Sequence, residues 1–320
     1  MRALVTGGAG FIGSHVVEAL LGRGYAVRVL DSFATGRREN LAAVADEIEL
    51  VEGDIRSYDR VRAAAQGCDV VVHEAALPSV VRSVEDPVAT TQVNVIGTLN
   101  VLLAARDADV GRLVLGSSSS VYGNGSVLPR TEDVPPEPVS PYAVSKLAAE
   151  GYCRSFVDLD GLDAVVLRYF NVFGARQDAR AEYVAVIPRF ITACLAGDRP
   201  TLFGDGEQSR DFTYVEDAAE ATVLAVTAGP ASGRVLNVAA GRATTLNELV
   251  DALQEATGRM IDPVTRPARP GEVRHSVASI EEARRVLGFE PSTGFAEGLA
   301  RTVDYFANRS AGSMRAASRA

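Results

Sequence analysis

Cysteine, histidine and tryptophan are scarce in this chain of 320 residues, which has three cysteines, three histidines and no tryptophan. Cys68, Cys153 and Cys194 are widely spaced and odd in number, so they predict neither a disulfide framework nor a zinc site. The few histidines also lack the spacing of metal ligands. We therefore expect no metal site, and a protein that works in a reducing compartment.

Long apolar runs and an excess of positive charge are missing as well. No uninterrupted apolar run approaches the roughly 20 residues of a membrane helix, and "MRALVTGGAGFIG" does not resemble a secretory signal. The net charge of −9 argues against nucleic acid or an anionic membrane as the main partner. The sequence predicts a cytoplasmic protein, and a small anionic ligand remains compatible with it because a basic pocket can be local.

Short apolar runs rich in β-formers alternate with longer segments that have helical spacing. This alternation predicts an α/β fold with a Rossmann-type, doubly wound parallel sheet. The runs are continuously apolar, as expected for strands that are covered on both faces. The predicted strands are 2–6, 26–30, 48–53, 69–73, 112–117 and 163–169.

The rhythm changes after about residue 170, where prolines and glycines become frequent. We interpret residues 171–212 and 241–307 as a smaller, mixed C-terminal domain that binds the substrate. Residues 1–170 are predicted to form the dinucleotide-binding domain. The chain is expected to return to this domain at about residues 213–240, because "GRVLNVA" (233–239) has the pattern of another sheet strand. Residues 308–320 lack apolar periodicity and are predicted to be a disordered tail.

A glycine cradle follows the first predicted strand directly. Gly7, Gly10 and Gly13 have the spacing G-x-x-G-x-x-G and precede a helical segment, so a pyrophosphate can approach the helix N-terminus. The second strand ends at Asp31, whose carboxylate can accept hydrogen bonds from the hydroxyls of an adenosine ribose. An acid at this place favours NAD over NADP, a preference that Arg37 and Arg38 could weaken. "GDI" (53–55) and "HEAA" (73–76) follow later strands and would line the same crevice.

A tyrosine and a lysine four positions apart begin another predicted helix, in "SPYAVSKLAAE" (140–150). Tyr142 and Lys146 share a helix face, and a serine cluster, "GSSSSVYG" (116–123), ends the strand before them. A lysine ammonium and an oxidised nicotinamide would stabilise a tyrosinate and lower the pKa of the phenol. An ordinary amphipathic pair has the same spacing, and the serines could fill a turn. The preceding cradle favours the catalytic interpretation.

Seven motifs resemble the extended short-chain dehydrogenase/reductase family, and in particular its nucleotide-sugar 4-epimerases. They extend over about residues 1 to 300: "VTGGAGFIGSH", "DSFATGRREN", "SSSSVYG", "SPYAVSKLAAE", "LRYFNVFGARQ", "GDGEQSRDFTYVED" and "RPGEVRHSVASIEEA". The resemblance implies NAD as cofactor, Tyr142 as base, Lys146 as its electrostatic partner and Ser118 as the hydroxyl nearest the sugar oxygen. The implied reaction is epimerisation through a transient 4-keto sugar.

The same resemblance implies the remaining site residues. The cofactor contacts would be Gly7, Gly10, Phe11, Ile12, Gly13, Asp31, Ser32, Gly36, Asp54, Ile55, Ala75, Ala76, Tyr142, Lys146 and Tyr169. The substrate contacts would be Ser118, Ser119, Ser120, Asn171, Arg210, Arg269, Glu272 and Ser276.

The sugar is left open by the sequence. Ser276 matches a family site where a bulky aromatic restricts some epimerases to sugars without an acetyl group, so a serine leaves room for UDP-N-acetylglucosamine, with UDP-glucose as a second choice. A UDP-glucuronate epimerase, a nucleotide-sugar dehydratase or decarboxylase, and a dinucleotide-sensing protein without catalysis are the alternatives. Dehydratases and decarboxylases of this family usually carry an acid just before the V-Y-G, whereas positions 118 to 120 here are all serine. This difference argues against a dehydratase and against a decarboxylase. The resemblance also implies a homodimer formed through the helix near 88–105 and the helix after Tyr142.

Overall fold

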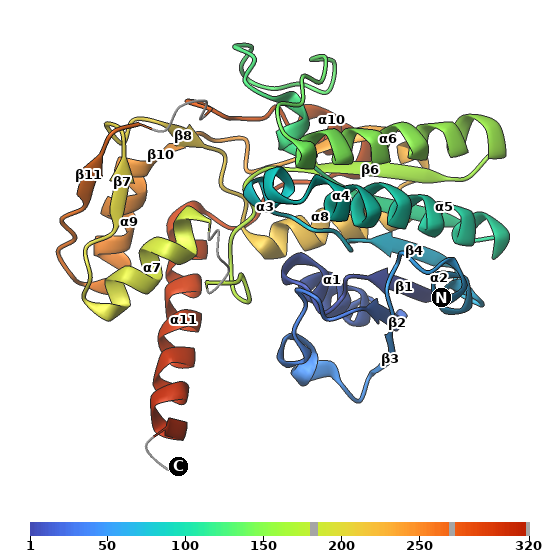
Figure 1. Ribbon diagram of the computed structural model, residues 1–320, viewed down its shortest axis with the longest axis horizontal. Coiled ribbons are helices and arrows are strands. Elements are labelled where there is room, and N and C mark those ends of the chain that lie inside the picture. The colour runs from blue at the N-terminus through green and yellow to red at the C-terminus, as the bar shows by residue number, and fades with distance from the viewer. Residues whose placement is uncertain (180–184, 269–272, 318–320) are drawn as a thin grey trace.

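The structure of the protein is a computed structural model that describes residues 1–179, 185–268 and 273–317. Its central sheet contains seven strands, all paired in parallel: β1 (Arg2–Thr6), β2 (Ala26–Asp31), β3 (Ile48–Glu52), β4 (Val70–His73), β5 (Arg112–Ser118), β6 (Ala164–Tyr169) and β9 (Val235–Val238). Their order is β3-β2-β1-β4-β5-β6-β9, and Figure 1 shows β3, β2, β1 and β4 in this succession. The order changes direction between β1 and β4, which is where doubly wound sheets bind ligands. The predicted fold class is confirmed, and the predicted return strand pairs with β6.

Helices cover both faces of this sheet, as its continuously apolar strands require. One face is packed by α1 (Phe11–Gly22), α8 (Val215–Thr227) and α10 (Glu281–Leu287). The opposite face is packed by α2 (Tyr58–Ala65), α5 (Thr98–Asp107) and α6 (Pro141–Asp160). All three cysteines are buried as free thiols.

One helical stretch, 87–107, is long and apolar enough to cross a membrane by length and composition alone, with a mean hydropathy of 1.4. It consists of α4 (Pro87–Thr91), the π-helix η2 (Gln92–Gly97) and α5. Polar residues interrupt its apolar run, which is why the sequence did not draw attention to it. Several apolar residues of its α5 part, including Val101 and Leu102, are buried in the core beside the sheet, so this part packs as a core helix.

The second lobe is mixed, as predicted, and lies beside the carboxyl ends of the sheet strands (Figure 1). Its strands form a parallel pair, β7 (Thr201–Phe203) with β11 (Val264–Arg266), and an antiparallel pair, β8 (Ser209–Arg210) with β10 (Thr244–Thr245). Its core gathers aromatic rings, among them Phe173, Phe212 and Phe295. Three helices surround that core: α7 (Val186–Ala196), α9 (Leu246–Thr257) and α11 (Phe295–Ala317). The remaining short helices are η1 (Arg38–Val44), α3 (Val80–Glu85), η3 (Ser119–Tyr122) and η4 (Gly229–Ala231).

Two predicted boundaries differ from the structure. Helix α10 lies within the stretch assigned to the second domain, yet Ala283, Val286 and Leu287 are buried in the core of the sheet. Their i, i+3, i+4 spacing gives α10 an apolar stripe that fits beside β9 and α8. The predicted disordered tail is also wrong in its first part, because α11 continues to Ala317. That segment contains no proline, so the helix can continue through it without apolar periodicity, although Gly312 and two serines are weak helix formers beside its alanine, arginine and methionine.

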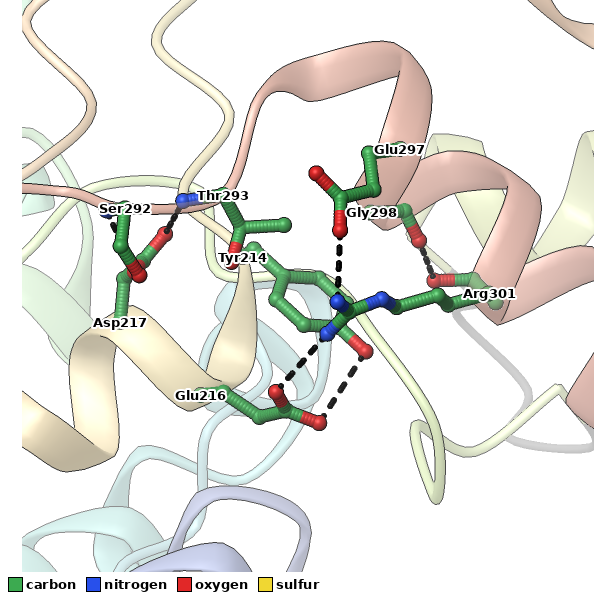
Figure 2. Close-up of polar contacts among 9 residues, drawn as sticks. Tyr214, Glu216, Asp217, Ser292, Thr293, Glu297, Gly298 and Arg301 are labelled. Carbon is green, nitrogen blue, oxygen red and sulfur yellow. Dashed lines mark hydrogen bonds and ion pairs between the residues drawn. The ribbon is translucent and has the colours of Figure 1, made fainter.

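A buried carboxylate joins the two lobes where α8 begins (Figure 2). Asp217 in the first turn of α8 accepts hydrogen bonds from the amide and hydroxyl of Ser292, both at 2.9 Å, and from the amide of Thr293 at 3.2 Å. A buried carboxylate requires such donors, and each hydrogen bond contributes about 1 kcal/mol. These bonds fix the chain segment that leads into α11.

Helix α11 itself approaches the same place closely at Gly298 (Figure 2). A Cβ at this position would lie 2.7 Å from Cδ2 of the Tyr214 ring, so only glycine allows the contact. Arg301, one turn further, pairs with Glu297 at 2.6 Å and with Glu216 at 3.1 Å. These charges are largely exposed and contribute little to stability. The junction therefore depends on the Gly298 contact and on Asp217.

Candidate active site

The glycine cradle lies at the point where the strand order changes direction. Gly7 has a φ of +72°, and a Cβ there would meet the backbone nitrogen of Ala75 at 2.6 Å. A Cβ on Gly13 would lie 2.2 Å from the carbonyl oxygen of Gly7. Glycine at both positions keeps the turn tight and lets α1 start directly beneath it. The amino end of α1, capped by Gly10, therefore opens into a cavity of about 300 Å³.

The acid at the end of β2 lines this first cavity. Asp31 accepts hydrogen bonds from the amide of Ala9 at 2.9 Å and from the amide of Phe33 at 2.8 Å, one on each carboxylate oxygen. Burial raises the pKa of Asp31, and these backbone hydrogen bonds oppose the rise. Each oxygen keeps a second lone pair, so the carboxylate can still accept a ribose hydroxyl.

The two arginines that follow point to other partners. Arg37 pairs with Asp178 at 2.8 Å, while Arg38 pairs with Glu52 and lies over the ring of Phe33 at 4.1 Å. A 2′-phosphate would have to compete with these carboxylates for either guanidinium. The expectation that the arginines could weaken the preference for an unphosphorylated ribose stays a prediction.

Tyr142 and Lys146 lie one turn apart on α6, and both are buried. The Ser118 hydroxyl, at the end of β5, lies close enough to the phenol of Tyr142 to lower its pKa. Lys146 Nζ donates to the carbonyl oxygen of Gly116 at 2.8 Å. All of these residues line a second cavity of about 850 Å³. The structure thus brings the predicted tyrosine, lysine and serine together at one wall.

The second cavity also collects most of the predicted substrate residues. Its wall includes Tyr169 at the end of β6, and Phe11 and Ile12 line it as well as the first cavity, so the two spaces adjoin. Arg269 and Glu272 lie outside the described residues. The predicted substrate residues in its wall are Ser118, Ser119, Ser120, Asn171, Arg210 and Ser276.

A third cavity, of about 280 Å³, continues from the second one into the second lobe. The two share Asn171, Gln177 and Arg210 in their walls. Beyond these residues the third cavity is lined by one cation and several aromatic rings, which suit a nucleobase: Arg189, Phe203 and Phe212. Sequence reasoning missed Gln177, Arg189, Phe203 and Phe212, because nothing local distinguishes them from core or surface residues.

Comparison with known proteins assigns the family. The profile of the NAD dependent epimerase/dehydratase family matches residues 3–239. The chain belongs to this family. A UDP-glucose 4-epimerase of Mycolicibacterium smegmatis is 42% identical over 315 residues, which cover 97% of this chain and 100% of that protein.

Two solved structures of this epimerase family are similar over nearly the whole chain. A UDP-N-acetylglucosamine 4-epimerase from Methanobrevibacter ruminantium, in complex with UDP-N-acetylmuramic acid, has a TM-score of 0.92 at 38% identity, covering 96% of this chain and 98% of its own. A UDP-glucose 4-epimerase of Thermus thermophilus, in complex with NAD, has a TM-score of 0.86 at 42% identity, covering 96% and 99%.

The cradle of this epimerase-family protein fits its cofactor, NAD. The turn is closed to any side chain at Gly7 and Gly13, so the backbone can approach a pyrophosphate closely there. The predicted contacts Gly7, Gly10, Phe11, Ile12, Gly13, Asp31, Ser32, Asp54, Ile55, Ala75 and Ala76 all line the first cavity. Gly36 lies just outside it, where a Cβ would lie 2.8 Å from the Asp31 carboxylate. Tyr142, Lys146 and Tyr169 line the adjoining one.

The charges around Tyr142 differ from the prediction. Burial raises the pKa of Tyr142, the hydrogen bond from Ser118 lowers it, and the charge of Glu74 raises it. Burial also lowers the pKa of Lys146, while Glu74 and Glu150 raise it. The lowered pKa predicted for the phenol is therefore not a property of the protein's own groups. Positive charge from an oxidised nicotinamide would act in the required direction.

The π-helix η2 helps to hold α6 in place. It turns Asn94 towards Leu77, with which Asn94 exchanges two hydrogen bonds, at 2.8 and 3.2 Å. The Asn94 amide also donates to Ser145 Oγ at 3.0 Å, and Ser145 donates to the carbonyl oxygen of Tyr142 at 2.7 Å. Ser83 of α3 accepts the Tyr142 amide hydrogen at 3.0 Å. π-Turns often mark functional sites, but the sequence pattern did not reveal this one.

A buried carboxylate organises the substrate side in the same way. Asp211 accepts backbone hydrogen bonds from Ala240 at 2.9 Å and from Ala278 at 3.1 Å. Burial raises its pKa to about 6, and the amide donors oppose this rise. Because Asp211 adjoins Arg210, and Ala278 lies two residues after Ser276, these bonds keep two predicted substrate residues on one wall.

Proposed function

We propose that the protein is an NAD-dependent UDP-sugar 4-epimerase, with Tyr142 as its base. The observation that supports this most is the meeting of Tyr142, Ser118 and Lys146 where the cofactor cavity adjoins the larger cavity. A tyrosine beside the predicted nicotinamide end of the cradle is placed to move a proton at a sugar hydroxyl. The relatives named as UDP-sugar 4-epimerases point to the same reaction.

The side chains divide the chemistry among them. NAD, when bound, supplies the hydride acceptor and donor. Tyr142 accepts the proton of the sugar's 4-hydroxyl, and Ser118 holds the same oxygen by a hydrogen bond. Lys146 contributes positive charge near the phenolate, and Arg210 binds the diphosphate. After the 4-keto sugar turns over, Tyr142 returns the proton to the new alcohol, so no net oxidation occurs.

We propose UDP-N-acetylglucosamine as the preferred substrate. The cavity of about 850 Å³ has Ser276, a small residue, in its wall. The backbone amide of Ser276 donates a hydrogen bond to the backbone carbonyl oxygen of Ser209. The nucleotide would extend into the third cavity, where rings and Arg189 line the wall. A small residue permits a large sugar without requiring one, so UDP-glucose and UDP-glucuronate remain the sugars to compare.

The purified protein, with no added NAD, is expected to convert UDP-N-acetylglucosamine to its 4-epimer, because NAD is regenerated in every cycle and can stay bound. Proton NMR of separate reactions with UDP-N-acetylglucosamine, UDP-glucose and UDP-glucuronate identifies each product. No conversion of any sugar, even with NAD supplied, would contradict the proposal: the nucleotide or the sugar would be a different one, or the protein would be a dinucleotide sensor without catalysis. A 4-keto-6-deoxy sugar or a pentose would indicate a dehydratase or a decarboxylase instead.

Ser276→Tyr serves as the matched variant for the acetyl group. The added ring should lower kcat/KM for UDP-N-acetylglucosamine at least tenfold, which corresponds to a loss of about 1.4 kcal/mol in transition-state stabilisation. UDP-glucose should lose much less, because it has no acetyl group to place. Equal losses on both sugars would remove Ser276 as the determinant of sugar size.

We propose further that the protein is a homodimer in the cytoplasm. Helices α3, α4, η2 and α6 pack side by side and expose large apolar residues to solvent: Val84, Val88, Ile96, Val144, Tyr152 and Leu159. A second copy of the same face would cover them.

Light scattering should therefore give twice the mass of the chain, and Val88→Glu, which adds a charge to that face, should give the mass of one chain. Met260→Glu, at an apolar residue 93% exposed in the second lobe, is the control and should stay dimeric. A single-chain mass for the unaltered protein would exclude this dimer.

A further inference from the structure

Glu74 is a partly buried acid in the catalytic centre to which the proposed reaction gives no role. It follows β4 directly and lines both the cofactor cavity and the larger cavity. The sequence placed "HEAA" in this crevice but singled out only its two alanines. The inference below rests on the proposed function, because it concerns the ionisation of the base Tyr142.

Two neighbouring strands hold the Glu74 carboxyl group in place. Its Oε1 accepts a hydrogen bond from the Tyr169 hydroxyl, on β6, at 2.7 Å. That hydroxyl also contacts Thr222 of α8 at 2.8 Å. The other carboxylate oxygen of Glu74, Oε2, lies against Gly116 of β5, where any Cβ would approach this oxygen to 2.6 Å. Glycine at 116 therefore admits the carboxyl group beside the carbonyl that binds Lys146.

The charged and titratable groups that face Glu74 come from α6 and β6. They are Tyr142, Tyr169 and Lys146. The hydrogen bond from Tyr169 lowers the pKa of Glu74, and so does the positive charge of Lys146. Burial outweighs both and raises the pKa of Glu74 to about 7. His73, the preceding residue, instead contacts Thr6 and Thr98 and is held neutral by burial, which lowers its pKa to about 3.

We propose that Glu74 is a positioning residue that sets the proton affinity of Tyr142: it anchors Tyr169 beside the nicotinamide end of the site, and its negative charge opposes formation of the tyrosinate. The sign follows from electrostatics. Ionising Tyr142 beside an ionised Glu74 places two negative charges in one buried site, so the phenol keeps its proton to higher pH. When Glu74 carries a proton, that opposition is gone.

Glu74→Gln removes the charge and keeps an oxygen acceptor for Tyr169. Lys146 keeps a second carboxylate, Glu150, one turn away on α6, so the ammonium stays supported. In the NAD-loaded enzyme, the pH midpoint of Tyr142 ionisation should therefore fall by about one unit. The fraction of tyrosinate at a fixed pH below both midpoints should rise about tenfold.

The midpoint can be measured without turnover, from the near-ultraviolet absorbance of tyrosinate. The chain has nine tyrosines and no tryptophan, so subtracting a titration of the Tyr142→Phe variant isolates Tyr142. For Glu74→Gln, the titration that is subtracted is that of the double variant carrying Glu74→Gln and Tyr142→Phe. Glu47→Gln, the same change at an exposed residue far from the site, is the control and should not move the midpoint. The acid limb of the kcat–pH profile should shift in the direction of the titration.

An unchanged or raised midpoint in Glu74→Gln would overturn the inference. Glu74→Met, which is uncharged and of similar length, should lower the midpoint too and replaces Glu74→Gln if that variant does not fold. Failure of the proposed function would look different, because the unaltered enzyme would form no 4-epimer while its tyrosine could still be titrated.

Discussion

Tyr142→Phe is expected to lower kcat for 4-epimerisation by on the order of 10³-fold, because the variant keeps the ring and loses the group that moves the proton. Bound NAD should remain, since Gly7, Gly13 and Asp31 lie in the first cavity and are untouched. Epimer formation is followed by proton NMR, and NAD is quantified after the protein is denatured.

Tyr25→Phe provides the control for this substitution. It removes the same hydroxyl from a partly buried tyrosine that packs at the periphery of the sheet core, and it should leave kcat unchanged. Undiminished turnover in Tyr142→Phe would exclude Tyr142 as the base. Loss of NAD together with activity would instead show that the phenol acts in cofactor binding.

The second large effect is expected for Gly13→Ala, which should abolish co-purification of NAD and lower the melting temperature. Its Cβ would lie 2.2 Å from the carbonyl oxygen of Gly7 and 2.9 Å from the carbonyl carbon. These are backbone atoms, so the turn or the start of α1 must move, and the phosphate site moves with it. Bound nucleotide and thermal unfolding are the two measurements.

Gly22→Ala, in the last turn of the same helix, separates this clash from the general effect of the substitution. No atom lies within 4 Å of a Cβ at that position. Because alanine has the better helix propensity, Gly22→Ala should keep NAD and match or exceed the stability of the unaltered protein. If Gly13→Ala behaved in the same way, the turn would not need glycine there.

The features that sequence reasoning located correctly are carried by short segments. The sheet strands are short apolar runs, and the helices of the first lobe show regular spacing, so local pattern was enough to predict them. The spacing of Tyr142 and Lys146 predicted only that they share one face of a helix, because four residues make about one turn. Gly13 was recognised by its place between a strand and a helix. The end of α11 was missed because the helix continues there without an apolar stripe.

The features that sequence reasoning missed bring together residues that are distant along the chain. The Arg37 and Arg38 guanidinium groups looked available for a phosphate, and only the fold supplied Asp178 and Glu52 as their partners. The cavity in the second lobe joins Gln177 to Phe203 and Phe212, and no spacing predicts such a wall. Asn94 lies in the π-helix η2 and is hydrogen bonded to Leu77, and a π-turn has no periodic signature.

The sequence by itself therefore determined the α/β class, the cofactor cradle with Asp31, and the tyrosine–lysine pair, because each depends on periodicity or on backbone sterics within a few residues. The tertiary structure alone decided the electrostatics of the site. It brought Glu74 of one strand end against Tyr169 and Gly116 of two other strands and within the field of Lys146 on α6. Burial and charge depend on distance through space, and a linear sequence does not contain that distance.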